Sequence, residues 1–88
     1  MEKLKKYLKS KNIRPNLRGY YYTLTAVEII RKTKIKTNIQ MMKLYAAVAE
    51  RHETKPSKVE RNIRNLIAHT ETRMTNGQFL FTWAEVEE

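Results

Sequence analysis

Arginine, lysine, asparagine and glutamate recur within one short stretch of the chain, residues 57–68, at spacings that a helix would bring to one face. With about 100° between successive residues, that face would carry Ser57, Lys58, Arg61, Arg64, Asn65 and Ala68, with Glu60 and Asn62 on its flanks. Such side chains can hydrogen-bond to base edges in DNA, because Arg pairs with guanine, Asn with adenine, and Glu accepts from cytosine. A solvated helix face has the same composition, so the neighbouring sequence must distinguish the two interpretations.

The opposite face of this stretch is apolar. Its apolar residues follow an i, i+4, i+7, i+8 spacing and are Val59, Ile63, Leu66 and Ile67. This spacing is typical of a helix packed on a core, so we predict a helix over about residues 55–70. The predicted N-cap is Thr54, with Pro56 tolerated in the first turn. The competing cap is Ser57, whose capping box would tie Glu60 to the backbone.

A helix over about residues 39–52 is predicted to precede it, with Thr37 or Asn38 as its N-cap. Its inward residues would be Met42, Tyr45, Val48 and Ala49, with Leu44 on the flank. Ala49 stands ten residues before Val59, and a small residue there lets two helices approach closely. We therefore predict a helix-turn-helix over about residues 39–71 whose second helix enters the major groove.

Two further helices are predicted upstream, over residues 1–10 and 21–33, joined by a loop over residues 12–19. Their predicted inward residues are Leu4, Tyr7, Leu8, Leu24, Val27, Ile30 and the stem of Arg31. Thr25 and Glu28 have the spacing of a capping box. Of Tyr20, Tyr21 and Tyr22, we expect one or two in the core and one exposed.

The tail, residues 73–88, is compatible with two structures. Asn76-Gly77 followed by alternating aromatic residues is typical of a strand after a tight turn, which would form a wing-like hairpin. A short helix would instead lay Phe79, Leu80 and Trp83 on the core. The predicted fold is thus all-α: one domain over residues 1–88, with four to five helices, a helix-turn-helix and a short aromatic C-terminal extension.

The residue types that are missing exclude several classes of function. The chain has no cysteine, and His52 and His69 stand 17 residues apart, so neither a disulfide nor a zinc site is expected. It also has no Asp and no glycine-rich phosphate loop. We therefore expect no enzyme, no cofactor and no small-molecule substrate. No apolar run approaches the roughly 20 residues that cross a bilayer, so we expect a cytoplasmic protein without membrane contact.

The charge of the chain is strongly positive and unevenly distributed. Of the net +9, residues 1–70 carry +12 and residues 71–88 carry −3. A basic body favours a polyanionic partner, for which nucleic acid is the leading candidate, ahead of an anionic membrane surface or an acidic protein. Together with the predicted helix-turn-helix, this favours double-stranded DNA. The predicted base-contacting residues are Lys58, Glu60, Arg61, Arg64 and Asn65, with Arg61 central. The predicted backbone-contacting residues are Lys43, Lys55, Ser57, Lys32, Lys34 and Lys36.

Parts of the sequence also resemble a known family. The matching residues are Leu44-Tyr45, Val48-Ala49, Thr54 and Ser57-Lys58-Val59-Glu60-Arg61-Asn62-Ile63-Arg64, with Gly19-Tyr20-x-Tyr22 and Ala26-Val27 upstream. On these residues the chain resembles the C-terminal DNA-binding effector domain of the stage 0 sporulation protein A family, over about residues 13–71. The resemblance implies an all-helical transcription regulator, encoded by a bacterium or phage and associated with the nucleoid when bound.

The resemblance also implies roles for particular residues. In the family, the residues matching Lys58, Glu60, Arg61 and Arg64 contact bases or the adjacent backbone. Lys58 stands where the family usually has Arg, and Asn65 where it usually has His, so we expect a different preferred DNA sequence. The family's two further helices, the last of them dimerising, and its receiver domain are expected to be missing here. A homodimer on DNA would then need another contact.

Two alternatives remain open at the level of sequence. One is a small phage- or plasmid-type interaction protein that binds a host protein, for which the acidic, aromatic tail would be the natural surface. The other is a nucleic-acid binder that recognises charge without reading sequence. Selection of a site from random DNA would separate base reading from both alternatives.

Overall fold

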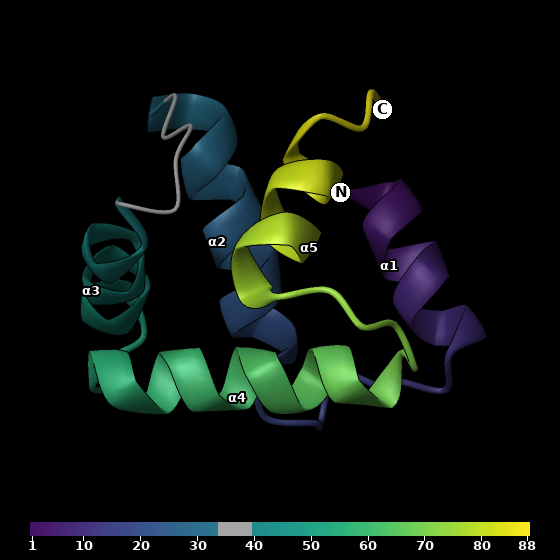
Figure 1. Ribbon diagram of the computed structural model, residues 1–88, viewed down its shortest axis with the longest axis horizontal. Coiled ribbons are helices and arrows are strands. Elements are labelled where there is room, and N and C mark those ends of the chain that lie inside the picture. Colours follow the sequence, from purple (N-terminus) through teal and green to yellow (C-terminus); the bar gives the residue numbers. More distant parts are fainter. Residues whose placement is uncertain (34–39) are drawn as a thin grey trace.

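Five α-helices account for most of the chain in the computed structural model, which describes residues 1–33 and 40–88 (Figure 1). They are α1 (Glu2–Ser10), α2 (Tyr20–Thr33), α3 (Met41–Arg51), α4 (Pro56–His69) and α5 (Asn76–Ala84). The predicted all-α fold is confirmed, and the first four helices lie within two residues of the predicted bounds. No described helix combines the length and apolar character needed to cross a membrane.

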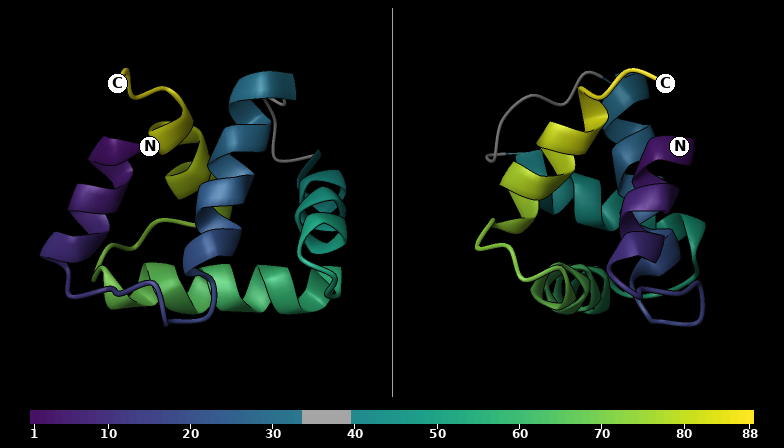
Figure 2. Two further views of the ribbon diagram at one scale, coloured as in Figure 1. Left: turned by 180° about the vertical axis from the view of Figure 1, so that it is seen from behind. Right: turned by 90° about the vertical axis from the view of Figure 1, so that its right-hand side faces the viewer.

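The helix α4 lies across one end of the other helices, and α2 rises from it through the middle of the molecule (Figures 1 and 2). The most extensive packing is that of α4 on α3 and of α5 on α2. The predicted apolar stripe of α4 is confirmed. Its four residues are each at most 2% exposed: Val59, Ile63, Leu66 and Ile67. Burial of this complete stripe fixes the rotation of α4 about its own axis, and this determines which face of the helix is exposed to solvent.

The inward face of α3 differs from the prediction by one position. Met41 is buried, whereas Met42 is 70% exposed, and Leu44 lies fully in the core rather than on the flank. Tyr45, Val48 and Ala49 are buried as predicted. The residue before the helix is Gln40, without a side-chain cap, and Thr37 and Asn38 lie outside the described residues. Adjacent methionines are equally apolar, so only the packing of α3 on α2 and α4 selects which one is buried.

The predicted interior of α2 is confirmed, and its predicted cap is wrong. Tyr20 is buried, Tyr22 is partly buried and Tyr21 is 54% exposed, which agrees with the division expected for the three tyrosines. Because the helix already begins at Tyr20, Thr25 lies in its interior and caps nothing. The Thr25 hydroxyl is instead hydrogen-bonded at 2.8 Å to Nε2 of His52, which ties α2 to the end of α3.

The aromatic tail is a helix, so the hairpin alternative is wrong. Thr75 is the N-cap of α5: its hydroxyl accepts from the backbone N–H of Gln78, and the Gln78 side chain accepts from the N–H of Thr75. This capping box satisfies two backbone donors at the helix start and makes Asn76-Gly77 the first turn of a helix. Phe79 and Leu80 are buried, and Trp83 is partly buried.

The two ends of the chain meet around Arg31. Its guanidinium donates to the backbone carbonyls of Trp83, Ala84 and Val86 at 2.9–3.2 Å, which holds the end of α5 against α2. Glu88 lies 2.9 Å from the amino group of Met1 and 3.7 Å from Arg31. The hydrogen bond from the amino group lowers the pKa of Glu88 to about 2, from an ordinary value of 4.5.

We expect Glu88→Gln to flatten the pH dependence of stability between about pH 4.5 and pH 2. A carboxyl group whose pKa is lowered by folding stabilises the folded state above its unfolded pKa, and that contribution is lost as the pH falls toward the folded value. The measurement is the urea midpoint at pH 5 and pH 3, on protein with no residue preceding Met1. Glu87→Gln, an exposed acid outside the ion pairs of the described residues, is the control. Equal losses in wild type and Glu88→Gln would contradict the expectation.

Candidate nucleic-acid interface

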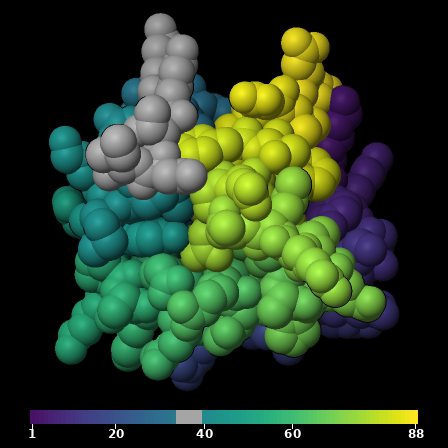
Figure 3. Space-filling model, in the orientation of Figure 1, coloured from purple at the N-terminus to yellow at the C-terminus, as the bar shows by residue number. Residues whose placement is uncertain are grey.

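The polar face of α4 is exposed as predicted. Exposed residues on it are Ser57, Lys58, Arg61, Arg64, Asn65 and Ala68, and the flanking Glu60 and Asn62 are partly buried. The side chains of α4 form one border of the molecule in the space-filling view (Figure 3). The structure therefore brings all five predicted base-contacting residues onto one helix at one surface.

The start of α4 corrects the predicted caps. Pro56 is the first helical residue, as expected, but the N-cap is Lys55 in an extended conformation, without a side-chain cap. Neither Thr54 nor Ser57 caps the helix. Proline tolerates the first helical position because it has no N–H to leave unsatisfied, and this places the cap on the residue directly before it. As a result, the Ser57 side chain stays at the surface, and Glu60 is not tied to the backbone of the helix start.

Glu60 instead forms an ion pair with Arg64, one turn further along the helix, at 3.1 Å. The Glu60 side chain is 35% exposed and the Arg64 side chain 61%, so solvent screens the pair, which contributes only a few tenths of a kcal/mol to helix stability. Its effect on the surface is to hold the Arg64 guanidinium beside Glu60. Within residues 1–33 and 40–88, the ion pairs do not involve Arg61 or Lys58.

One flank of α4 is covered by the loop over residues 11–19. Gly19 has a φ of +93°, and a Cβ placed on it would collide with the backbone carbonyl of Asn62. The loop and α4 are thus in direct backbone contact. Arg18 lines a hollow of about 400 Å³ together with Lys58 and Asn62. This contact brings the side chain of Arg18 to the edge of the exposed face of α4 that is predicted to contact bases.

Arg14 and Arg18 are candidate phosphate-contacting residues that the sequence analysis missed. Both are exposed in the loop beside α4. The signal in the sequence was two arginines within a segment rich in turn residues, directly before Gly19. Turn composition predicted the loop, but only the contact between Gly19 and Asn62 shows that it lies against α4.

The other flank of α4 is held by Asn76 at the start of α5. Its side-chain amide donates to the Tyr45 hydroxyl at 3.0 Å and to the Glu60 carbonyl at 3.1 Å. Burial raises the pKa of Tyr45, so its hydroxyl stays protonated and remains a hydrogen-bonding partner at neutral pH. One amide group therefore joins α3, α4 and α5 directly behind the ion pair of Glu60 and Arg64.

The predicted backbone-contacting residues are only partly brought together. Lys55 and Ser57 lie at the start of α4, and Lys43 is exposed on α3. Lys32 lies in the last turn of α2, the end remote from α4, and its ammonium is 3.3 Å from Glu28 (Figures 1 and 2). Lys34 and Lys36 lie outside the described residues. Among the described residues, no group of three His, Asp or Glu side chains is arranged to hold a metal ion.

A comparison with known families agrees with this arrangement. The family model described as "Sporulation initiation factor Spo0A C terminal" matches residues 4–81. The match begins in α1 and ends in α5, so it extends past both ends of the predicted resemblance over residues 13–71. The matched domain therefore includes residues 76–81 of α5. No curated protein and no solved structure matches the chain.

Proposed function

The chain belongs to the family of Spo0A C-terminal domains, which bind DNA as transcription regulators, and from this premise we propose that it recognises specific double-stranded sequences through α4 in the major groove. The observation that supports this most strongly is the division of α4 into a fully buried apolar stripe and an exposed basic and amide face. A helix with its side chains is about 10–12 Å across, which suits a major groove about 12 Å wide.

Arg61 is proposed as the principal base reader. It is exposed near the middle of α4, so its guanidinium can reach the groove floor and donate two parallel hydrogen bonds to guanine. Asn65 lies one turn further along the same face and suits adenine. Lys58 offers an ammonium where the family usually has a guanidinium, so it would act as a point charge without a bidentate contact.

Glu60 is proposed as a positioning residue for Arg64 rather than as a base reader. The 3.1 Å ion pair occupies one oxygen of the carboxylate and favours conformations of Arg64 that keep its guanidinium beside Glu60. An arginine with fewer populated conformations loses less side-chain entropy when it binds. Lys55, Ser57 and Lys43 are proposed to hold phosphates around the groove, and Lys32 is left out because of its position at the far end of α2.

The alternative of an interaction protein depended on the aromatic tail as a surface. Phe79 and Leu80 of that tail are at most 1% exposed, and Phe81 and Trp83 pack partly against the core. These side chains are therefore committed to the fold. The tail therefore presents its acidic residues to solvent, but only a small part of the aromatic surface that this alternative named.

We expect selection from random duplex DNA to return an enriched sequence, and Arg61→Ala to weaken binding to it by about 1–3 kcal/mol with relaxed preference at one position. The measurement is the dissociation constant for the selected site and its single-base variants. Lys32→Ala, which removes the same charge at the far end of α2, is the matched control. If no sequence is enriched, or if both variants lose affinity equally, the base-reading proposal is wrong. A homodimer on DNA stays a prediction, for which the selected sequence would contain two half-sites about 10 bp apart.

A further inference from the structure

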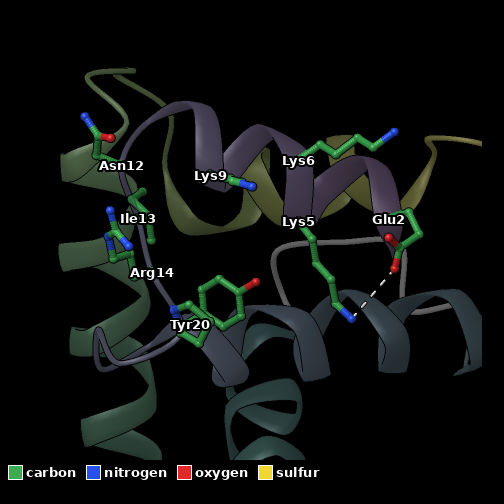
Figure 4. A pocket seen from close by; sticks show the side chains of 9 residues that line it. Glu2, Lys5, Lys6, Lys9, Asn12, Ile13, Arg14 and Tyr20 are labelled. Atoms are coloured by element: carbon green, nitrogen blue, oxygen red, sulfur yellow. Dashed lines mark ion pairs between the residues drawn. The ribbon is translucent and has the colours of Figure 1, made fainter.

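A basic cleft lies apart from α4, between α1, the loop over residues 11–19 and the first turn of α2 (Figure 4). Its volume is about 500 Å³. Lys5, Lys6, Lys9 and Arg14 line it, with Glu2 at one end. None of these residues was assigned a role in the proposed reading of bases.

The positive charge of the cleft is poorly neutralised by the protein itself. Glu2 is its only acidic lining residue and lies 3.9 Å from Lys5, at the limit of an ion pair. Lys6, Lys9 and Arg14 take part in no ion pair within residues 1–33 and 40–88. Uncompensated cations gathered in a concave surface raise the local concentration of anions. The cleft is therefore suited to a ligand that carries several negative charges.

The floor of the cleft is formed by buried residues and includes one hydroxyl group. Ile13 and Tyr20 are 3% and 7% exposed, and Figure 4 shows Tyr20 between Arg14 and Lys5. Burial, more than the neighbouring Tyr21 and Glu2, raises the pKa of Tyr20. A phenol that stays protonated can donate a hydrogen bond to a phosphate oxygen.

The cleft is fixed to the predicted recognition helix by the loop that they share. Pro15 lines both this cleft and the hollow that holds Arg18 and Lys58 beside α4. The contact of Gly19 with the Asn62 backbone holds the same loop on α4. Seen from behind, the loop runs from the end of α1 alongside α4 to the start of α2 (Figure 2). DNA lying against α4 would therefore pass close to the loop that lines one side of the cleft.

The spacing of the cations favours a strand of phosphates over a single small anion. Lys5 and Lys9 are one helical turn apart, a rise of about 6 Å along α1. Arg14 and Arg18 continue the basic series along the loop toward α4. A nucleic-acid strand presents one negative charge for about every 3.4 Å of duplex axis, so cations about 6 Å apart can follow the strand and meet about every second phosphate.

We propose that this cleft is a second phosphate-binding surface, which holds the sugar-phosphate backbone of the same DNA beyond the groove that α4 enters. The proposal rests on the proposed function, because it takes the DNA bound by α4 as its ligand. The contact lengthens the bound segment past the recognised bases and contributes affinity without sequence preference.

The test compares two double variants of equal charge. Lys9→Gln with Arg14→Gln removes two cations of the cleft. Lys3→Gln with Lys32→Gln removes two exposed cations that line neither the cleft nor the hollow beside α4. Dissociation constants are measured against salt concentration, on a duplex limited to the selected site and on one extended by about 10 bp at each end. The charge-preserving pair Lys9→Arg with Arg14→Lys controls for damage to the fold.

On the extended duplex, we expect Lys9→Gln with Arg14→Gln to make the negative slope of log affinity against log salt concentration shallower by about 2. Each lost phosphate contact reduces the size of that slope by about 0.9. We also expect this variant to lose the advantage that wild type gains from the longer duplex, while the charge-preserving pair keeps that advantage. If both neutralising variants change the slope equally, the cleft proposal is wrong and base reading by α4 still stands. If wild type binds neither duplex at low salt, the proposed function fails as well.

Discussion

Gly19→Ala is expected to destabilise the fold by about 2–5 kcal/mol, although it adds only one methyl group. A non-glycine residue in the left-handed region costs about 1–2 kcal/mol. The added methyl group would also collide with the Asn62 carbonyl, which belongs to the backbone of α4 and cannot rotate away as a side chain could. Overpacking of this kind costs a further 1–3 kcal/mol or so.

The measurement for Gly19→Ala is the free energy of unfolding in urea, together with the melting temperature. In a domain of this size, each kcal/mol lowers the melting temperature by roughly 4–8 °C. Gly77→Ala is the matched control, because Gly77 lies in the first turn of α5 and outside the left-handed region. That control should change stability by no more than about 1 kcal/mol. Similar losses in the two variants would show that the contact with Asn62 does not constrain the loop.

Gly19→Ala is also expected to change DNA binding. Gly19 is the point at which the loop carrying Arg14 and Arg18 meets α4. If the alanine variant relaxes by lifting the loop, those arginines move away from the face of α4 that is proposed to read bases. Folded Gly19→Ala protein should then show a smaller salt dependence of binding than wild type, even where sequence preference is kept.

The two faces of α4 could be predicted from the sequence alone because helical periodicity is a local property. All four apolar positions and all six exposed ones follow directly from the spacing within residues 57–68. The same periodicity that buries the apolar residues places the predicted base-contacting residues on the opposite, exposed side of α4. Their contact with bases is a separate matter that stays a prediction.

Features set by tertiary packing could not be predicted. The choice between Met41 and Met42 depends on which side of α3 meets its neighbours, and the two residues have the same side chain. The contact of Gly19 with Asn62 joins residues far apart in the chain. Lys32 was grouped with the DNA-contacting lysines by composition, but the direction of α2 carries it to the end remote from α4.

The tail shows how one pattern can satisfy two structures. Aromatic residues at 79, 81 and 83 alternate like a strand, whereas 79, 80 and 83 share one face of a helix. The decisive residues are Thr75 and Gln78, whose side chains close a capping box. Neither the hairpin nor the helix interpretation of the sequence included this pair, although its spacing is visible there.

Phe79→Ala is the prediction that measures how far α5 belongs to the core, and we expect a loss of about 3–5 kcal/mol. Phe79 is 1% exposed, and its ring centroid lies 6.3 Å from that of Tyr7 and 6.4 Å from that of Trp83. Truncation would remove these aromatic contacts and leave a cavity between α1 and α5. A rigid helix framework closes such a cavity only partly, so the cost exceeds the transfer free energy of the lost atoms.

Met42→Ala is the control for Phe79→Ala, because Met42 is 70% exposed and its loss should change stability by less than about 0.5 kcal/mol. Both variants are compared with wild type by urea unfolding at neutral pH. The slope of the free energy against urea should stay unchanged if α5 unfolds together with α1–α4. A loss near that of the control would mean that α5 only covers a core that α1–α4 already complete. The expected large loss would instead make α5 a part of the framework that holds α4 in position, through the Asn76 amide and the packing of Phe79 together.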